Sequence, residues 1–277
     1  MSQDVRAYAG VIRPPLPGRA RKPRSEGQTM VIDKGLGLAQ TRALLELAGE
    51  YIDFIKLGFG TAALYPEQVL REKVALIRGH GVEPYPGGTF FEVAVLQGRL
   101  EPFLEATWSL GFRTVEVSDG TIDLDPRERE RAIRAARAFG FTVITEVGKK
   151  DGARTLDPAL ARAQIEADLA AGAAKVVLEG RESGKGVGLY DGEGRLRPGL
   201  LEELTAGLPD PGAIMWEAPL KAQQQELIAR FGVNVNLGNV APDEVVALEA
   251  LRCGLRGDTL KLVTEGERAG FGGLHGR

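Results

Sequence analysis

The sequence has very little of two residue types that often carry chemistry. Its single cysteine, Cys253, excludes an internal disulfide and any cysteine cluster for zinc or iron–sulfur. Its two histidines, His80 and His275, each lie beside glycine in segments that we expect to be solvated loops. A histidine-rich metal site is therefore excluded and histidine catalysis is disfavoured. The polar chemistry must come from carboxylates, lysines, arginines and backbone amides.

Long apolar runs and a charge excess are also absent. No stretch approaches the roughly 18 apolar residues of a membrane span, and the N-terminus lacks the apolar core of a signal peptide. Lys+Arg 35 against Asp+Glu 38 gives a net charge of -3, so no basic field favours nucleic acid or anionic lipid. We therefore expect a cytoplasmic protein with a small-molecule substrate, and neither a nucleic-acid nor a membrane partner.

The 277 residues divide into three predicted segments. Residues 1–28 contain PPLPGRARKPR and little apolar periodicity, which predicts an extended basic arm that packs on the main body. Contact of this arm with a neighbouring subunit or a phosphate-rich partner is the alternative. Residues 29–265 form the expected catalytic domain, and residues 266–277 form a glycine-rich tail.

Eight β-branched or apolar runs, each 6 to 10 residues long, predict buried strands. The runs are TMVIDK (29–34), YIDFIKLG (51–58), VEPYPGG (82–88), TVEVSDG (114–120), FTVITEVGKK (141–150), KVVLEGRE (175–182), AIMWEAP (213–219) and VNVNLGN (233–239). Amphipathic stretches with proline near the start and glycine at the end, such as DPALARAQIEADLAAG (157–172), predict the intervening helices.

This alternation predicts an α/β protein with a single (β/α)₈ barrel of the TIM type, preceded by the N-terminal extended arm. Closure into a barrel would also remove exposed sheet edges. A doubly wound open sheet is the alternative. It is disfavoured because the sequence after the first strand, DKGLGLAQ, does not complete the dinucleotide fingerprint G-x-G-x-x-G.

Charged side chains gather at the predicted carboxyl ends of the strands, where a barrel builds its active site. Alternate side chains of a strand share a face, so Glu146 and Lys150 should point the same way, with Lys149 turned towards the helices or rim. Oxygen ligands of the kind that Mg²⁺ prefers are offered by Glu116, Asp119, Glu146 and Glu179. In the alternative, these carboxylates form metal-free ion pairs with Lys34, Lys56, Lys150 and Arg181.

Two loops carry groups suited to binding an anion. GRESGKGVG (180–188) offers a guanidinium, a hydroxyl, an ammonium and backbone amides through Arg181, Ser183, Gly184 and Lys185. It lacks the G-x-x-x-x-G-K-[ST] spacing of a Walker A loop, and a solvated flexible loop is the alternative. NLGNVAPDE (236–244) lies at the usual phosphate site of a barrel and offers Asn236, Gly238 and Asn239, with an ordinary turn as the alternative.

The sequence contains, in chain order, VIDKGLG, YIDFIKLGFGTAA, YPGGTFFE, VEVSDGTIDL, TEVGKK, EGRESGKGVGLYD, EAPLKAQQ and NVNLGNV followed by LRCGLRGDT. Together these motifs resemble the phosphosulfolactate synthase family from about Thr29 to Thr259, with residues 1–28 outside the resemblance. TEVGKK and EGRESGKG are its most specific strings. The resemblance implies a Mg²⁺-dependent barrel that adds sulfite to phosphoenolpyruvate to give (2R)-phospho-3-sulfolactate, the opening step of coenzyme M biosynthesis in methanogens.

The residue chemistry agrees with this resemblance. Both substrates are anions, and their mutual repulsion would be offset by Lys34, Lys56, Arg181 and Lys185. After sulfur attacks C3, we expect Lys150, beside Glu146, to protonate C2, with Lys56 in reserve. A Mg²⁺-dependent barrel enzyme for another phosphorylated carboxylate and a non-catalytic, stress-associated interaction protein remain alternatives. A homo-oligomer is expected because barrel enzymes often associate.

Overall fold

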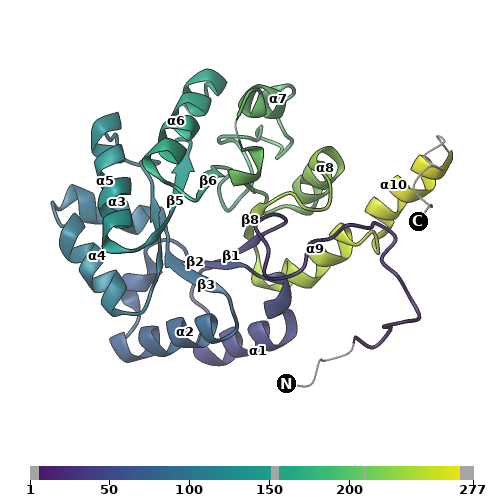
Figure 1. Cartoon of the computed structure of the whole chain (residues 1–277), viewed down its shortest axis with the longest axis horizontal. Helices are drawn as coiled ribbons and strands as arrows, with labels where there is room; N and C mark the ends of the chain where they lie inside the picture. The colour runs from purple at the N-terminus through teal and green to yellow at the C-terminus, as the bar shows by residue number, and fades with distance from the viewer. Residues whose placement is uncertain (1–5, 151–155, 209, 269–277) are drawn as a thin grey trace.

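Parallel strands form the centre of the molecule and helices surround them (Figure 1). The computed structural model describes residues 6–150, 156–208 and 210–268. The strands are β1 (Thr29–Asp33), β2 (Phe54–Leu57), β3 (Glu83–Pro86), β4 (Thr114–Val117), β5 (Thr142–Val147), β6 (Lys175–Leu178), β7 (Ile214–Glu217) and β8 (Leu237–Val240). Hydrogen bonds join them in the order β3-β2-β1-β8-β7-β6-β5-β4. The eight-stranded parallel sheet confirms the predicted barrel class.

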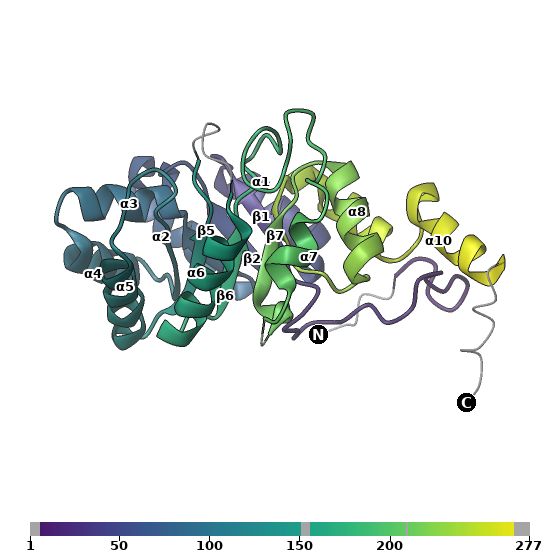
Figure 2. The ribbon, with the colours of Figure 1, turned by 90° about the horizontal axis from the view of Figure 1, so that it is seen from above.

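Helices follow the strands around the outside of the sheet (Figure 2). They are α1 (Leu38–Ala48), α2 (Glu67–Gly79), α3 (Gly88–Leu96), α4 (Leu100–Ser109), α5 (Pro126–Phe139), α6 (Pro158–Ala171), α7 (Leu200–Thr205), α8 (Lys221–Phe231), α9 (Val245–Arg252) and α10 (Gly257–Arg268). Short 3₁₀ turns span Gly49–Tyr51, Thr61–Leu64, Pro211–Ala213 and Pro242–Glu244.

Local sequence signals set the ends of α5 and α6. Asp125 caps α5 by accepting a hydrogen bond from the Arg127 amide, and Asp157 caps α6 in the same way. Proline occupies the first position of each helix, where its missing N–H leaves no intrahelical bond unmade. Each ends at a glycine with positive φ, Gly140 or Gly172. These helices therefore begin and end where the sequence predicts.

The barrel interior has an apolar layer below a charged one. Met30, Phe54, Tyr85, Ile144, Val177 and Met215 form one buried cluster. Because every second side chain of a strand faces the same side, Phe54 is followed by Lys56 and Ile144 by Glu146. The apolar layer fills the barrel, and the next inward positions place charge at the carboxyl ends.

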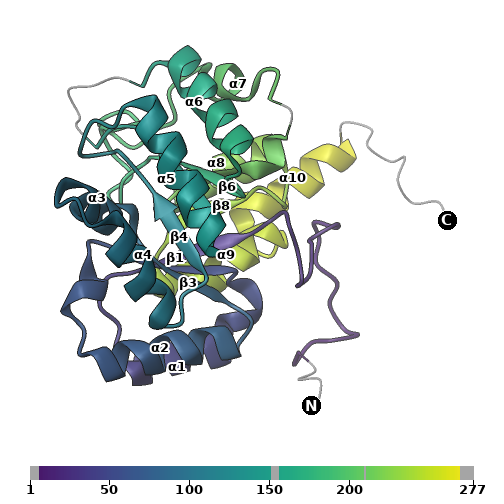
Figure 3. The same cartoon turned by 60° about the vertical axis from the view of Figure 1, so that its left-hand side comes forward.

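The sheet differs from a fully hydrogen-bonded barrel at one seam. In the described part of the chain, no strand ladder joins β3 to β4, although the two strands lie side by side. Two helices, α3 and α4, connect them and pack against each other, and α3 also packs on β4 (Figure 3). The expectation that closure removes every sheet edge is thus wrong here, and α3 covers the seam instead.

The described part of the arm packs on the amino ends of the strands. The guanidinium of Arg24 pairs with Asp53 at 2.8 Å, and that of Arg19 pairs with Glu249 at 3.0 Å. Figure 2 shows the arm along the face opposite the loop that follows β6. No helix within the described ranges is long and apolar enough to cross a membrane.

Candidate active site

A cavity of about 440 Å³ opens at the carboxyl ends of the strands. Most barrel strands or the loops after them contribute to its wall, as is usual for active sites in this fold. The lining residues are Ile32, Lys56, Gly58, Phe59, Gly87, Gly88, Thr89, Gly120, Thr121, Glu146, Lys150, Glu179, Arg181, Glu182, Glu217 and Asn239.

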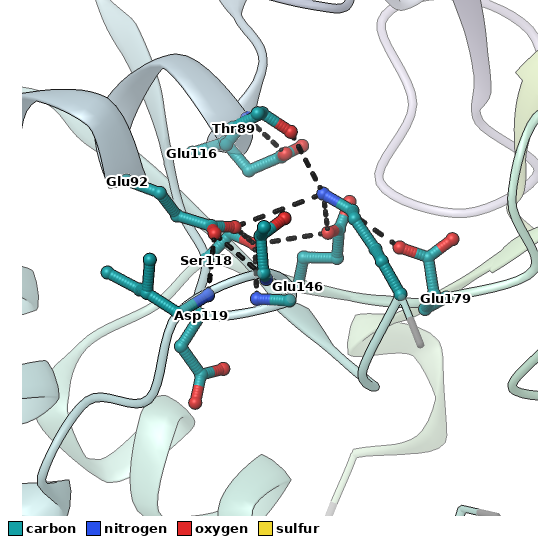
Figure 4. A network of polar contacts seen from close by, with 12 residues as sticks. Thr89, Glu92, Glu116, Ser118, Asp119, Glu146 and Glu179 are labelled. Atoms are coloured by element: carbon teal, nitrogen blue, oxygen red, sulfur yellow. Dashed lines mark hydrogen bonds and ion pairs between the residues drawn. The ribbon is translucent and has the colours of Figure 1, made fainter. Parts of the chain in front are cut away.

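Two lysines and several carboxylates form a buried network within this site, and Figure 4 shows Glu116, Glu146 and Glu179 of this network. Lys56 Nζ lies 3.0 Å from Glu116 Oε1, 2.8 Å from Glu146 Oε2 and 3.6 Å from Glu217 Oε1. Lys150 Nζ lies 2.8 Å from the other oxygen of Glu146. Glu146 therefore bridges the two ammonium groups from the centre of the network.

Strand parity correctly predicts how the two neighbouring lysines after β5 are oriented. Lys150 turns into the cavity, where Nζ also donates to Thr89 Oγ1 at 3.2 Å. Lys149 turns to the rim, where Nζ lies 3.0 Å from Asp119 Oδ2 and donates to the Ile122 carbonyl oxygen at 2.8 Å. Of these two lysines, only Lys150 lines the cavity.

The pKa of Glu146 is shifted downwards, whereas those of Glu116 and Glu179 are shifted upwards. Burial opposes ionisation of Glu146, but Lys150 and Lys56 outweigh it and hold its pKa well below the ordinary value. Burial raises the pKa of Glu116 to about 7, and burial with the charges of Glu217 and Glu146 raises that of Glu179 well above its ordinary value.

The lysines remain protonated at neutral pH. Burial would lower the pKa of Lys150, but Glu146 and Glu179 raise it above its ordinary value. For Lys56, the neighbouring Glu116, Glu146 and Glu217 likewise outweigh burial, and its pKa lies well above the usual range. Lys150 is thus a charged ammonium group at the wall of the cavity.

Backbone strain is concentrated at the cavity. Three non-glycine residues in the described segments have positive φ, namely Phe59 (56°), Arg181 (60°) and Asn239 (54°), and all three line the cavity. This conformation is unfavourable for a residue with a Cβ atom and is common at functional sites. Asn239 adds a second signal, because its Oδ1 is buried without a hydrogen-bond partner.

The predicted metal ligands fall into two groups. Glu116, Glu146 and Glu179 belong to the buried network, and the Oε2 atoms of Glu116 and Glu179 lack hydrogen-bond partners. Glu179 also lines the cavity, whereas Glu116 does not. Asp119 is separate from them, because its carboxylate pairs with two other side chains. Its Oδ1 lies 2.8 Å from Arg129 Nη1, and its Oδ2 lies 3.0 Å from Lys149 Nζ.

The same groups suit a divalent cation only in part. Within the described ranges, no cluster of three or more His, Cys, Asp or Glu side chains is arranged to hold a metal ion. Mg²⁺, however, commonly takes only one or two carboxylates together with substrate and water. Glu179 lines the cavity, and its buried Oε2 lacks a hydrogen-bond partner and lies 3.9 Å from Lys150 Nζ, whereas each oxygen of Glu146 lies 2.8 Å from a lysine Nζ.

The glycine-rich loop after β6 contributes less to the cavity than predicted. Arg181 lines it and donates from Nη1 to the Lys150 carbonyl oxygen at 2.7 Å. Ser183 and Lys185 are exposed and lie outside the cavity wall. The Gly184 amide donates to the Arg181 carbonyl, so it is not free for an anion. The structure places only the first part of this loop at the site.

The loop around β8 requires a larger correction. The strand begins at Leu237, so Asn236 lies at its amino end, where its side chain bonds the Gln28 amide and the Gly212 and Ile214 carbonyls. Gly238 faces the apolar layer, because a Cβ there would lie 2.8 Å from Met30 Cε. Of the three predicted anion-binding residues, only Asn239 lines the cavity.

Lys34 lines a second cavity of about 360 Å³ that shares Ile32, Glu182 and Asn239 with the first. Its Nζ lies 5.7 Å from the centre of the Phe59 ring. Lys34 therefore borders the mouth of the site, beyond the network around Lys56.

Two buried glutamates of the site are absent from the predicted set. Glu217 ends β7, a position that the strand-end rule indicates, and its Oε2 accepts a hydrogen bond from the Gly180 amide at 2.9 Å. Glu92 lies within the apolar helix α3, where no local pattern marks it. Its carboxylate accepts hydrogen bonds from Ser118 Oγ and from the Thr121 and Ile122 amides.

The fold and the site together define a (β/α)₈-barrel enzyme whose charged cavity lies at the carboxyl ends of its strands. The (2R)-phospho-3-sulfolactate synthase family model matches residues 17–258, and the chain belongs to this family. The match begins within the arm, so the expected limit of the resemblance at Thr29 is wrong. Arg19 and Arg24, which anchor the arm, lie inside the matched range.

Named relatives support the same assignment. The chain is 48% identical over 246 residues to the phosphosulfolactate synthase of Methanothermobacter thermautotrophicus, covering 88% of this chain and 95% of the relative. It is 46% identical over 237 residues to that of Methanocaldococcus jannaschii, covering 84% and 93%. A solved 3-hexulose-6-phosphate synthase has a TM-score of 0.51 at 18% identity, covering 81% and 98%, and shares the barrel fold.

Proposed function

We propose that this protein catalyses the Mg²⁺-dependent addition of sulfite to C3 of phosphoenolpyruvate, giving (2R)-phospho-3-sulfolactate. The observation that carries the proposal is the protonated Lys150, held on Glu146 at 2.8 Å at the wall of a 440 Å³ cavity, in a chain of the phosphosulfolactate synthase family. The cavity is large enough for a three-carbon phosphate ester and a sulfite ion.

The reaction needs one nucleophile and one acid. The sulfur lone pair of sulfite forms the C3–S bond, and the π electrons of the C2–C3 double bond move to C2 and onto the substrate carboxylate. Lys150 then gives a proton to C2 and recovers one from water at the mouth of the cavity. The phosphate ester is retained. Glu146 and Thr89 fix the ammonium, so the proton reaches one face of C2 and one enantiomer forms.

Cationic and amide groups have the separate task of bringing two anions together. Arg181 lines the cavity and is suited to the carboxylate or phosphate of phosphoenolpyruvate. Asn239 and Lys34 border the neighbouring cavity and offer further donors. Lys56 lies below them with three carboxylate neighbours and keeps Glu146 ionised. In these assignments, the groups that attract the two anions lie at the rim of the cavity, and the group that transfers the proton lies at its wall.

In this proposal Glu179 holds the divalent cation, with Glu116 and Glu146 behind it. The support is that Glu179 lines the cavity, that its buried Oε2 has no hydrogen-bond partner and only a 3.9 Å ion pair with Lys150 Nζ, and that carboxylates outnumber lysines around it. When bound, Mg²⁺ supplies positive charge to offset the negative charge that develops on the substrate carboxylate. Asp119 is left out, because its ion pairs with Arg129 and Lys149 direct it away from this set.

A substrate screen tests the proposal. Purified protein with Mg²⁺ is given phosphoenolpyruvate and sulfite, and the products are identified by mass spectrometry. Parallel reactions replace sulfite with other nucleophiles, or phosphoenolpyruvate with other phosphorylated carboxylates. We expect a sulfonated product only from phosphoenolpyruvate and sulfite. Turnover of a different pair would reassign the substrate, and inactivity of the folded, Mg²⁺-loaded protein towards every pair would contradict the assignment as an enzyme of this class.

A further inference from the structure

Glu92 connects two parts of the barrel that the sheet leaves unconnected. It lies on α3, which follows β3, and the residue is 1% exposed. Oε1 accepts a hydrogen bond from Ser118 Oγ at 2.8 Å, and Oε2 accepts from the amides of Thr121 at 2.8 Å and Ile122 at 3.1 Å (Figure 4). These partners follow β4, so the side chain crosses the seam between β3 and β4.

The start of α3 supports the same contact. The Gly88 amide donates to Glu116 Oε1 at 2.6 Å, one helical turn before Glu92. A Cβ at Gly88 would lie 2.4 Å from Ser118 Cβ, so only glycine allows the helix to approach β4 this closely. The helix is therefore seated against β4 at its first residue, and Glu92 holds the loop that follows the strand.

This loop, residues 118–122, forms the wall beside Lys150. The Gly120 carbonyl accepts a hydrogen bond from the Lys150 amide at 2.9 Å. A Cβ at Gly120 would lie 3.1 Å from Cγ, Cδ and Cε of Lys150, so the lysine side chain runs directly along the loop backbone. Movement of the loop would release the lysine from this wall.

Helix α3 also contacts the tip of Lys150. Thr89 Oγ1 lies 3.2 Å from Nζ, and Glu92 Oε1 lies 4.0 Å from it. Ser118 Oγ, which Glu92 binds, is also 3.1 Å from Glu146 Oε1, the atom that pairs with Lys150. The helix thus contacts Lys150 directly at its ammonium group, and indirectly through the 118–122 loop and through Ser118 and Glu146.

We propose that Glu92 is a positioning residue for Lys150, which clamps the 118–122 loop to α3 and so holds the ammonium at one place on the cavity wall. The kinetic part of this inference rests on the proposed function, whereas the clamp does not. Its action depends on the length of the side chain, because three donors on the far side of the seam must all be reached.

Two substitutions of Glu92 distinguish the effect of its side-chain length from the effect of its charge. Glu92→Gln keeps the length: its carbonyl oxygen accepts from the two amides, and its NH₂ group donates to Ser118 Oγ, which remains free to donate to Glu146. Glu92→Asp keeps the charge but is one methylene shorter, so it loses contact with the loop. A matched control pair, Glu105→Gln and Glu105→Asp, changes an exposed glutamate on the neighbouring helix α4.

Hydrogen exchange of the 118–122 amides tests the clamp without any substrate. We expect wild-type protection in Glu92→Gln and in both Glu105 variants, and exchange faster by about tenfold or more in Glu92→Asp, since buried hydrogen bonds are lost. Wild-type protection of these amides in Glu92→Asp would overturn the proposal, whatever reaction the protein catalyses.

Steady-state kinetics with phosphoenolpyruvate and sulfite tests the effect on Lys150. We expect Glu92→Asp to lower kcat by about tenfold or more with KM nearly unchanged, and Glu92→Gln to retain most of kcat. Loss of protection with wild-type kcat in Glu92→Asp would reject the positioning role, as would a lower kcat in Glu92→Gln than in Glu92→Asp. If wild-type protein showed no turnover, the proposed function would fail and the exchange result would still decide the clamp.

Discussion

Lys150 Nζ and Glu146 Oε1 lie 2.8 Å apart, four residues from each other in sequence, where β5 passes into its loop. The second oxygen of Glu146 lies 2.8 Å from Lys56 Nζ. The carboxylate of Glu146 thus pairs with two ammonium groups. The side chain of Lys150 is 22% exposed, and that of Lys56 is only 8% exposed. This relationship leaves Lys150 both charged and open to a substrate.

Substitution of Lys150 should remove the proton donor and leave the fold intact. We expect Lys150→Ala and Lys150→Arg to lower kcat by roughly 10²–10⁴-fold, since arginine keeps the charge but does not release its proton at neutral pH. Lys221→Ala, which changes an exposed lysine on α8, should leave kcat unchanged. The measurement is kcat with circular dichroism of each variant, and a folded Lys150→Arg protein with wild-type kcat would exclude Lys150 as the acid.

Arg181 and Lys185 lie in the same loop but differ in their relation to the cavity. Because Arg181 lines the cavity and Lys185 does not, Arg181→Ala should raise the KM for phosphoenolpyruvate by about tenfold or more. Lys185→Ala should change it by less than about twofold, as expected for an exposed charge. Initial rates over a range of phosphoenolpyruvate concentrations decide this, and a larger KM effect from Lys185→Ala would reverse the two assignments.

Removal of the cation ligand should abolish the stabilisation that the cation provides. A ligand present at about 100 times its Kd stabilises the folded state by roughly 2.7 kcal/mol. We therefore expect Mg²⁺ to raise the Tm of chelator-treated wild-type protein, and Glu179→Gln to lose that rise. Asp119→Asn is the comparison and should retain it. Differential scanning calorimetry measures these Tm values and does not depend on catalytic activity. A rise in Tm with Mg²⁺ in Glu179→Gln equal to that of wild type would exclude this residue as a cation ligand.

Glu116 should make the metal-free protein less stable as the pH rises. Burial raises its folded-state pKa from 4.5 to about 7, so the folded protein retains a proton that the unfolded chain releases. Stability therefore falls between about pH 4.5 and 7 and levels off above, by up to about 3 kcal/mol for this group.

Glu116→Gln lacks this proton and should remove that part of the decline. Urea unfolding of both proteins at pH 5 and pH 8, in chelator, measures the effect. We expect the variant to gain stability relative to wild type on going from pH 5 to pH 8. An identical difference between the two proteins at both pH values would contradict the raised pKa of Glu116.

The arm should contribute to stability through Arg24. Its pair with Asp53 has side chains only 3% and 7% exposed, and Asp53 Oδ2 also accepts a hydrogen bond from the Thr29 amide at the start of β1. Arg24→Ala leaves the Asp53 carboxylate buried without its cationic partner and should lower the free energy of unfolding by about 3–5 kcal/mol. Arg21→Ala, at an exposed arm position, is the control. Equal urea midpoints for the two variants would show that the pair does not hold the arm.

The strands and the inward charges were predictable because their signals are local. A buried parallel strand is a short apolar run, and parity along FTVITEVGKK separates Lys150 from Lys149. Local patterns do not show where a ladder begins, however. VNVNLGN alternates like a strand from Val233, but β8 begins only at Leu237, which leaves Asn236 at the amino end of the strand.

Glu92 shows a second limit of sequence reasoning. Within GTFFEVAVL it is a lone charge in an apolar helix, and its partners lie 26 to 30 residues further along the chain. Only the packing of α3 across the seam brings them together. Arg24 and Asp53 are a similar case, since the pair joins two segments 29 residues apart. Contacts of this kind follow from the assembled fold.

A phosphorus NMR time course of wild-type protein and Lys150→Arg, run side by side with phosphoenolpyruvate, sulfite and Mg²⁺, tests most directly whether Lys150 is the acid of this reaction. We expect wild-type protein to convert the phosphoenolpyruvate resonance into a new phosphate-ester resonance, from a product with the mass of phosphosulfolactate, and Lys150→Arg to leave the substrate unchanged. An unchanged phosphoenolpyruvate resonance with folded wild-type protein would contradict the proposed reaction, and equal conversion by both proteins would contradict the role of Lys150.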